Sequence, residues 1–312
     1  MNEGLKVARL FHFLGKGGVG KTTSAALQSV LLSKKGKTLL VSLDPAHNLG
    51  DVLNAKLKDE PTKISENLYA MEPDINKLMS EYSKKIAKEI ESHYKYLKVL
   101  NLDKLVRTIE YTPGVEEQVL LEEITRLMEL DYDYVVIDHA PTALSVRVLL
   151  LPQILLNWLS QIRELRLQIL KRRKVLGNEE IEDKVLEILN GEINKYERVE
   201  KVFKSKNLSP ITIVLNPEEM PCLEAVRIKE VLRKFDMPLC GVVVNKVIFQ
   251  ESSDPTLSTM KEIQRKWIEF IEREFGGYQI VKVPYIAPPP RGVKVLEEIA
   301  DKYLGEPLCY SG

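Results

Sequence analysis

The sequence predicts an α/β fold in which a doubly wound, mostly parallel sheet carries an inserted helical subdomain. Short apolar runs recur along the chain with helical patterns between them, and a glycine-rich loop directly follows the first run. Most runs are continuously apolar, as strands buried on both faces of a parallel sheet are. Strands that alternate with helices indicate a doubly wound arrangement. The expected strands are Val7–Leu14, Thr38–Leu43, Leu68–Met71, Tyr134–Ile137, Ile211–Leu215, Gly241–Asn245 and Ile280–Val283.

Two intervals do not fit this alternation and carry long helical patterns. Within residues 74–128, apolar side chains recur at three- and four-residue spacing over Ile75–Leu97, which makes one stripe of an amphipathic helix. Within residues 153–205 the pattern returns over Ile181–Phe203. We expect these two intervals to form the helical subdomain; the alternative is that each stripe simply packs on its neighbour. The core is then expected to comprise residues 1–73, 129–152 and 206–312.

The charge balance argues against a nucleic-acid partner. The 312 residues include 45 Lys plus Arg and 45 Asp plus Glu, so the formal net charge is zero. A protein that coats DNA is usually visibly basic, because it neutralises phosphates. With 44% hydrophobic and 29% charged residues, the composition is that of an ordinary globular protein.

Cysteine usage and the apolar segments bear on the compartment. The three cysteines, Cys222, Cys240 and Cys309, form no Cys-x-x-Cys pair, which predicts isolated reduced thiols and no zinc or iron–sulfur site within the chain. The charged first ten residues do not resemble a signal peptide. The most apolar stretch, Leu144–Ile162, is interrupted by Pro152 and predicts a buried or half-buried helix rather than a membrane span. We therefore expect a cytoplasmic protein.

A glycine-rich loop follows the first expected strand and opens a helix. Its glycines allow backbone conformations that other residues avoid, so successive N–H groups can point at phosphate oxygens. The N-terminus of the following helix also favours an anion. In such a motif Lys21 reaches the β- and γ-phosphates and the Thr22 hydroxyl binds magnesium, so we expect a P-loop core that uses ATP and Mg²⁺. The expected nucleotide-binding loop comprises Gly15, Lys16, Gly17, Gly18, Val19, Gly20, Lys21, Thr22 and Thr23.

Carboxylates follow two further expected strands. Asp44 and Asp51 come after the strand Thr38–Leu43, and a carboxylate near the γ-phosphate can position or deprotonate the attacking water. Asp138 follows the fourth expected strand, where an aspartate would contact magnesium through water; its alternative role is to cap the following turn. We expect Asp44 to contact magnesium through water as well. His47 lies between Asp44 and Asp51, and it is as readily an ordinary surface histidine as a residue of the site.

These motifs resemble those of the arsenite-pump ATPases and tail-anchored-protein targeting factors, a family within the deviant Walker A ATPases. The family's loop, Gly-Lys-Gly-Gly-Val-Gly-Lys-Thr-Thr, matches Gly15–Thr23. Its first switch, Asp-Pro-Ala-His-Asn-Leu-Ser-Asp, matches Asp44–Asp51 with Gly50 in place of Ser. The resemblance covers nearly the whole chain, and the two motifs together are highly specific.

The resemblance implies roles for particular residues and a partner. Lys16 would reach across a homodimer to the partner's nucleotide, and with Lys21 and Asp51 it would form the catalytic set. Asp51 would be the residue that positions the attacking water. Asn245 would contact the adenine, and Pro284 would begin a loop that closes over it.

The sequence departs from the family pattern at two places. The second switch, Asp138–Ser145, has His139, Ala143 and Leu144 where the family has Thr, Gly and His. An alanine cannot adopt every conformation that a glycine can, so the motion of this switch is open to question. The targeting factors commonly carry a Cys-x-x-Cys that binds zinc across the dimer, but Phe249–Lys261 contains no cysteine. We therefore expect no zinc site, and dimer contacts of another kind.

Two amphipathic insertions joined to a switch-bearing core favour one function among three. The leading hypothesis is a homodimeric ATPase with an apolar groove, opened and closed by nucleotide, that shields the hydrophobic transmembrane tail of a client protein; a membrane receptor would be a further partner. The alternative is the ATPase subunit of an arsenite or other metalloid efflux pump, but those enzymes use three cysteines in a duplicated chain. A partition ATPase would need a basic patch or an amphipathic anchor, and the tail Gly305–Gly312 is neither.

Overall fold

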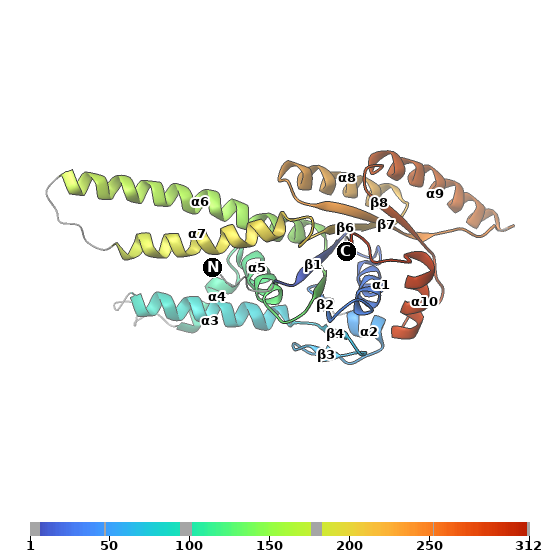
Figure 1. Ribbon diagram of the computed structural model, residues 1–312, viewed down its shortest axis with the longest axis horizontal. Coiled ribbons are helices and arrows are strands. Elements are labelled where there is room, and N and C mark those ends of the chain that lie inside the picture. The colour runs from blue at the N-terminus through green and yellow to red at the C-terminus, as the bar shows by residue number, and fades with distance from the viewer. Residues whose placement is uncertain (1–6, 47, 94–101, 176–182, 252, 311–312) are drawn as a thin grey trace.

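The core of the structure is one mostly parallel sheet with helices packed around it (Figure 1). The computed structural model describes residues 7–46, 48–93, 102–175, 183–251 and 253–310. In this part of the chain eight strands follow the order β3-β4-β2-β5-β1-β6-β7-β8, and β3 alone runs antiparallel to its neighbour. The strands are β1 (Arg9–Leu14), β2 (Thr38–Ser42), β3 (Thr62–Lys63), β4 (Leu68–Met71), β5 (Tyr134–Asp138), β6 (Ile211–Leu215), β7 (Leu239–Val247) and β8 (Gln279–Pro284).

The α/β fold class and all seven expected strands are confirmed. The sequence did not predict β3, because a two-residue edge strand is too short to show a period. Alternate residues of β1 face opposite layers: Leu10 and Leu14 pack in one hydrophobic cluster, and Phe11 and Phe13 pack in the other. Helices α1 (Lys21–Ser33), α2 (Leu49–Leu53) and α10 (Val293–Tyr303) contribute to the Phe11 side, and α5 (Val115–Met128), α6 (Thr142–Val175), α7 (Lys184–Phe203), α8 (Glu219–Lys234) and α9 (Pro255–Glu274) to the Leu10 side.

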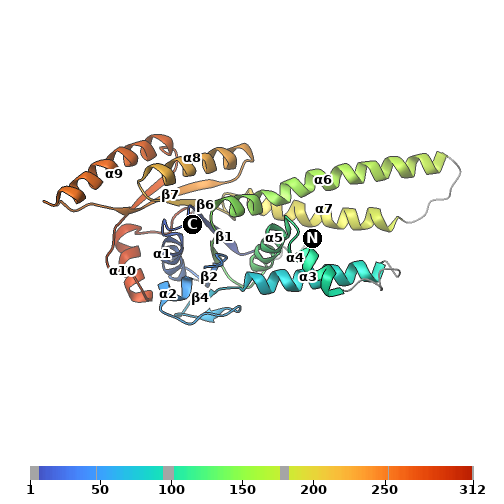
Figure 2. The same ribbon diagram turned by 180° about the vertical axis from the view of Figure 1, so that it is seen from behind.

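Four helices extend beyond the sheet on the same side of the molecule, as Figures 1 and 2 show from opposite directions. They are α3 (Ile75–His93), α4 (Leu102–Glu110) and the outer parts of α6 and α7, which pack together as a hairpin. The Asp183 carboxylate caps α7 and accepts a hydrogen bond from Arg166 Nε of α6 at 2.8 Å. Because α5 and the inner parts of α6 and α7 share the hydrophobic cluster of the sheet, the subdomain boundaries stay a prediction.

Helix α6 is unusually apolar for its length. Among the described residues it is the one helix long and apolar enough to cross a membrane by length and composition, over Ala143–Arg172. In its most apolar window, 44% of the residues are buried inside the chain. The helix continues through Pro152, so the expected half-buried helix is present and longer than its apolar core suggested.

The prediction of three isolated thiols was wrong. Cys240, at the start of β7, and Cys309, in the C-terminal tail, form a disulfide with a Cα–Cα distance of 5.9 Å. The tail reaches this position because Gln28 of α1 binds Leu308 through two hydrogen bonds, of 3.0 Å to its carbonyl and 2.8 Å from its N–H. Because the two cysteines are separated by 69 positions in the sequence, no local spacing rule could reveal the pair. Cys222 is a free, buried thiol.

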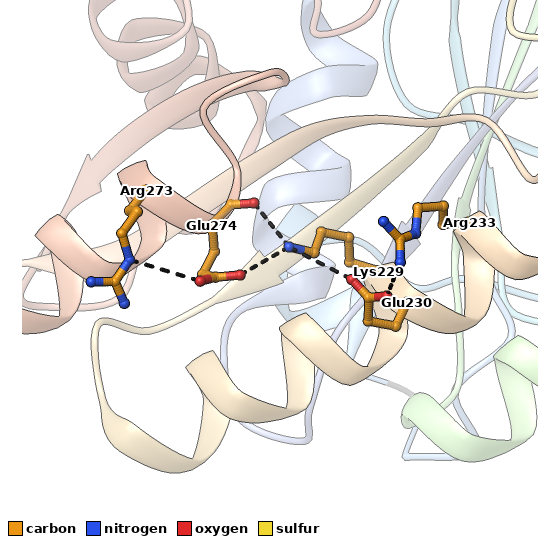
Figure 3. Close-up of polar contacts among 5 residues, drawn as sticks. All are labelled: Lys229, Glu230, Arg233, Arg273 and Glu274. Carbon is orange, nitrogen blue, oxygen red and sulfur yellow. Dashed lines mark hydrogen bonds and ion pairs between the residues drawn. The ribbon is translucent and has the colours of Figure 1, made fainter.

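A charged cluster fixes the end of α9 against α8 (Figure 3). Lys229 Nζ donates to the Glu274 carbonyl oxygen at 2.9 Å and lies 3.1 Å from its carboxylate. The same ammonium group sits 5.0 Å from the centre of the Phe275 ring. A cation at the C-terminus of a helix satisfies a carbonyl and the helix dipole together. This contact holds the C-terminal end of α9 against α8.

Candidate nucleotide-binding site

The glycine-rich loop connects β1 to α1, and two of its glycines are required by their surroundings. Gly15, Gly18 and Gly20 have φ values of 156°, 80° and 93°. A Cβ at Gly15 would collide with the Val214 carbonyl of β6, and one at Gly20 would collide with the Asn245 amide of β7. The loop is therefore pressed against two neighbouring strands, which presents its N–H groups at the carboxyl edge of the sheet.

Lys21 and Thr22 lie at the start of α1 where the motif predicts them. Lys21 is only 5% exposed, and its Nζ donates to the Lys16 carbonyl at 3.4 Å. The Thr22 hydroxyl donates to Asp138 Oδ2 at 2.6 Å. Ser42 at the end of β2 donates to the same oxygen at 3.4 Å. Two of the three residues predicted to hold magnesium, Thr22 and Asp138, are thus in contact although they lie far apart in the sequence.

Asp138 is buried with one carboxylate oxygen unused. Its Oδ1 has no hydrogen-bond partner among the described residues. Burial raises the pKa of Asp138 to about 7, although Thr22, Lys21 and Ser42 act in the opposite direction. A nearby cation would favour the ionised carboxylate.

The donor set fits magnesium better than a metal that needs a full protein cage. The described residues contain no group of three or more His, Cys, Asp or Glu side chains that could hold a metal. Magnesium prefers oxygen ligands and usually takes one or two from the protein, with phosphates and waters completing its shell. The free oxygen of Asp138 and the Thr22 hydroxyl match that requirement.

The loop after β2 and the start of α2 carry the two aspartates, and Asp44 is half-buried. Asp44 Oδ1 accepts a hydrogen bond from the Ala46 N–H at 3.0 Å. Asp51 is exposed in the first turn of α2, and His47 lies outside the described residues. Sequence reasoning missed Glu72, whose Oε1 accepts the Leu49 N–H at 2.7 Å and so caps the start of α2. Its position directly after the expected strand Leu68–Met71 was the available signal.

The end of β7 supports the phosphate loop from the side. Asn245 is buried, and its Nδ2 donates to the Val19 carbonyl at 2.8 Å. Lys246, which the sequence analysis did not single out, has a φ of 58° and donates from Nζ to the Gly18 carbonyl at 2.8 Å. The contact of Asn245 with adenine stays a prediction. Pro284 ends β8, beside the end of β7.

A cleft of about 410 Å³ opens beside the loop. Asn216, at the end of β6, is 7% exposed, and its Oδ1 is buried with no hydrogen-bond partner among the described residues. Sequence reasoning missed Asn216, although it follows an expected strand just as Asp138 does. The cleft is lined by Lys16, Gly17, Gly18, Val19, Asn216, Glu218, Glu219, Met220 and Pro221.

A comparison with protein families decides the identity of this arrangement. The model of the family described as anion-transporting ATPase matches residues 8–305. The chain belongs to this family. Membership accounts for the phosphate loop, for the sheet that carries it and for the resemblance seen in the sequence, and it makes the chain an ATP-hydrolysing enzyme.

Individual members of the family include proteins with two kinds of name. The chain is 32% identical to putative arsenical pump-driving ATPase 2 of Aquifex aeolicus over 94% of this chain and 98% of that protein. It is 31% identical to a putative arsenical pump-driving ATPase of Chlorobaculum tepidum over 96% of this chain and 76% of that protein. It is 27% identical to the ATPase get3 of Pyrenophora tritici-repentis over 95% of this chain and 91% of that protein.

Proposed function

We propose that this ATPase captures the hydrophobic transmembrane tail of client proteins in a nucleotide-controlled dimer. The observation that carries the proposal is an exposed apolar stripe on α6. Its two most exposed members, Trp158 and Leu165, are each 60% exposed. At 3.6 residues per turn the four stripe residues fall within about 60° of the helix circumference. The stripe consists of Ile154, Trp158, Leu165 and Ile169.

The neighbouring helix also carries exposed apolar side chains. Val185 and Ile188, near the start of α7, are exposed, and Ile188 is 63% exposed. Exposed apolar side chains gathered on one face of a helix usually mark a binding site, since water-facing helices normally present polar side chains. Arg166 and Asp183 fix the two helices together beside it. An apolar helix of a client would bury its side chains on this stripe.

ATP hydrolysis at the phosphate loop would supply the energy for such capture. Lys21 would bind the β- and γ-phosphates, and Asp138 and Thr22 would hold magnesium, with Asp44 contributing through water. Magnesium would neutralise charge that develops on the transferred phosphoryl group. Asp51 would orient the attacking water, and closure of the loop after β2 would bring its exposed side chain toward the site.

A second copy of the chain is the partner we propose for the core. Lys16 lies in the cleft of the loop with Gly17 and Asn216, where the nucleotide of a facing subunit could be reached. A second exposed apolar group sits on the β7–α9 loop and α9, beside a cleft of about 580 Å³. It comprises Phe249, Leu257, Met260 and Ile263 and offers dimer contacts that require no zinc.

The names of two relatives favour a second candidate, an ATPase that drives an arsenical pump. A metalloid site made of three thiolates does not fit the three cysteines of this chain. Cys240 and Cys309 are joined in a disulfide, and Cys222 is buried, with burial raising the pKa of its thiol to about 12. Stimulation of ATP turnover by arsenite would favour the pump.

The test is co-elution of the purified protein with a hydrophobic helix peptide in size-exclusion chromatography, with ATP and the Asp51→Asn variant. Asp51→Asn should bind ATP but hydrolyse it slowly, and so hold the complex together. Trp158→Ser combined with Leu165→Ser should abolish co-elution. The matched control changes adjacent exposed polar positions of the same helix, Asn157→Ser with Glu164→Ser, and should keep it. Equal capture by both double variants would remove the stripe from the proposal.

A further inference from the structure

Three buried polar side chains form a row beneath the phosphate loop. His12 is fully buried in the middle of β1. Its Nδ1 lies 2.9 Å from Nε2 of His139, and its Nε2 lies 2.8 Å from Oγ of Ser209. His139 and Ser209 are almost fully buried as well. None of these side chains belongs to the nucleotide-binding residues described above.

The row connects the segment after Asp138 to the roots of the α6–α7 hairpin, by which we mean the start of α6 and the end of α7. His139 directly follows Asp138, and its N–H donates to the Phe13 carbonyl of β1 at 3.3 Å. Helix α6 begins three residues further on, and α7 ends at Phe203. The Phe203 ring meets the His12 ring edge-on, with centres 5.8 Å apart. Ser209 lies in the segment between the end of α7 and β6.

The hydrogen bonds of the row depend on each other. Burial lowers the pKa of His12 to about 3, so its ring is neutral and has one donor and one acceptor nitrogen. If His12 donates to His139, its other nitrogen must accept from Ser209; if it donates to Ser209, it must accept from His139. A displacement of His139 therefore changes the geometry available to Ser209, because both bonds pass through one rigid ring.

We propose that His12 is a positioning residue that couples the segment after Asp138 to the roots of the α6–α7 hairpin. When the Asp138 segment moves with the state of the nucleotide, His139 moves with it, and His12 transmits that displacement through Ser209 to the segment that joins the end of α7 to β6. In this proposal the hairpin has two arrangements, one for each arrangement of the site, as coupling between distant sites requires. The inference rests on the ATPase activity and is independent of which client the hairpin binds.

The chain carries its own reporter for this coupling. Its two tryptophans are Trp158, exposed on α6, and Trp267 on α9. In a Trp267→Phe background, Trp158 emission and hydrogen exchange of α6 and α7 are compared with ADP and with a non-hydrolysable ATP analogue. The parent should respond to the change of nucleotide. His12→Phe should reduce that response by at least about fivefold while nucleotide affinity stays within about twofold.

Three variants separate coupling from packing. Phe203→Leu alters the contact with the His12 ring but removes no hydrogen bond, so it should keep the response. His12→Gln retains one donor and one acceptor and should restore part of it. Ser209→Ala removes the last hydrogen bond of the row without altering the rings, and it should weaken the response. It replaces His12→Phe as the test if that variant fails to fold. A parent that does not respond, a full response in His12→Phe, or equal losses in Phe203→Leu and His12→Phe would each overturn the proposal.

Discussion

The two edges of the sheet differ in what their polar side chains contact. At the carboxyl edge, Asp138 and Asn216 each keep a buried oxygen without a hydrogen-bond partner among the described residues. At the amino edge, the tail that ends the described chain is bound from several strands at once. Buried polar groups are ordinarily satisfied, so two unpartnered oxygens beside the phosphate loop indicate a site prepared for a ligand.

At the amino edge, polar side chains from several strands bind the C-terminal tail. The Cys309 carbonyl accepts from Arg9 of β1 at 2.7 Å, and its N–H donates to Gln279 of β8 at 3.0 Å. The Tyr134 and Tyr310 hydroxyls lie 3.1 Å apart. With the disulfide, these contacts join the starts of β1, β5, β7 and β8 to one short segment. The tail thus ties these strands together at the edge opposite to the one that carries the phosphate loop.

The largest effect should come from Lys21 at the carboxyl edge. Lys21→Ala removes the buried ammonium group beside the phosphate loop, and turnover should fall by roughly 100-fold or more, as for other lost donors to a developing charge. ATP turnover and nucleotide binding measure the loss. Lys34→Ala, at the far end of the same helix, removes only an exposed pair with Asp301 and should leave turnover unchanged. Normal turnover in Lys21→Ala would contradict the assignment of the site.

The contrast between the edges also explains what the sequence could reveal. The carboxyl edge was largely predictable: the loop Gly15–Thr23 is a local motif, and Asp138 directly follows a strand with a clear apolar pattern. The amino edge was not, because Cys240 and Cys309 meet only through the path of the tail. His12 was hidden for the same reason, since its partners lie 127 and 197 residues away in the sequence. Local patterns report local chemistry, and contacts across the sheet require its strand order.

The next effect should appear at the amino edge, in stability rather than in activity. Reduction of the Cys240–Cys309 disulfide frees a loop of 69 residues in the unfolded chain and should lower the free energy of unfolding by about 2–4 kcal/mol. Turnover at moderate temperature should stay the same, because the disulfide lies at the edge away from the phosphate loop. Urea denaturation with and without dithiothreitol measures the change.

A double variant provides the control for this experiment. Cys240→Ser with Cys309→Ser should match the reduced protein and show no response to dithiothreitol. If reductant destabilises the double variant as much as the parent, the effect belongs to something other than this disulfide. If reduction lowers turnover before it lowers stability, the two edges are not separate in function, and the comparison fails.

The smallest effect should be a pH dependence at the carboxyl edge. Burial raises the pKa of Asp138 to about 7, above the value of 3.8 for a free carboxyl group. In the protein without ligand, the stability that comes from protonated Asp138 is present below pH 4 and is lost as pH rises through 7. Magnesium needs the ionised form, so its apparent affinity at fixed nucleotide should fall by about tenfold per pH unit below 7.

Titration of Mg²⁺ at pH 8, 7 and 6, followed by nucleotide-dependent thermal stabilisation, measures this competition. Asp138→Asn should bind magnesium weakly at every pH, and any slope that remains reports the titration of the nucleotide phosphates themselves. Asp131→Asn changes an exposed carboxylate and should retain the parent's slope. If the magnesium affinity of the parent varies with pH no more than that of Asp138→Asn, Asp138 is ionised over the whole range. That result would contradict the raised pKa of Asp138.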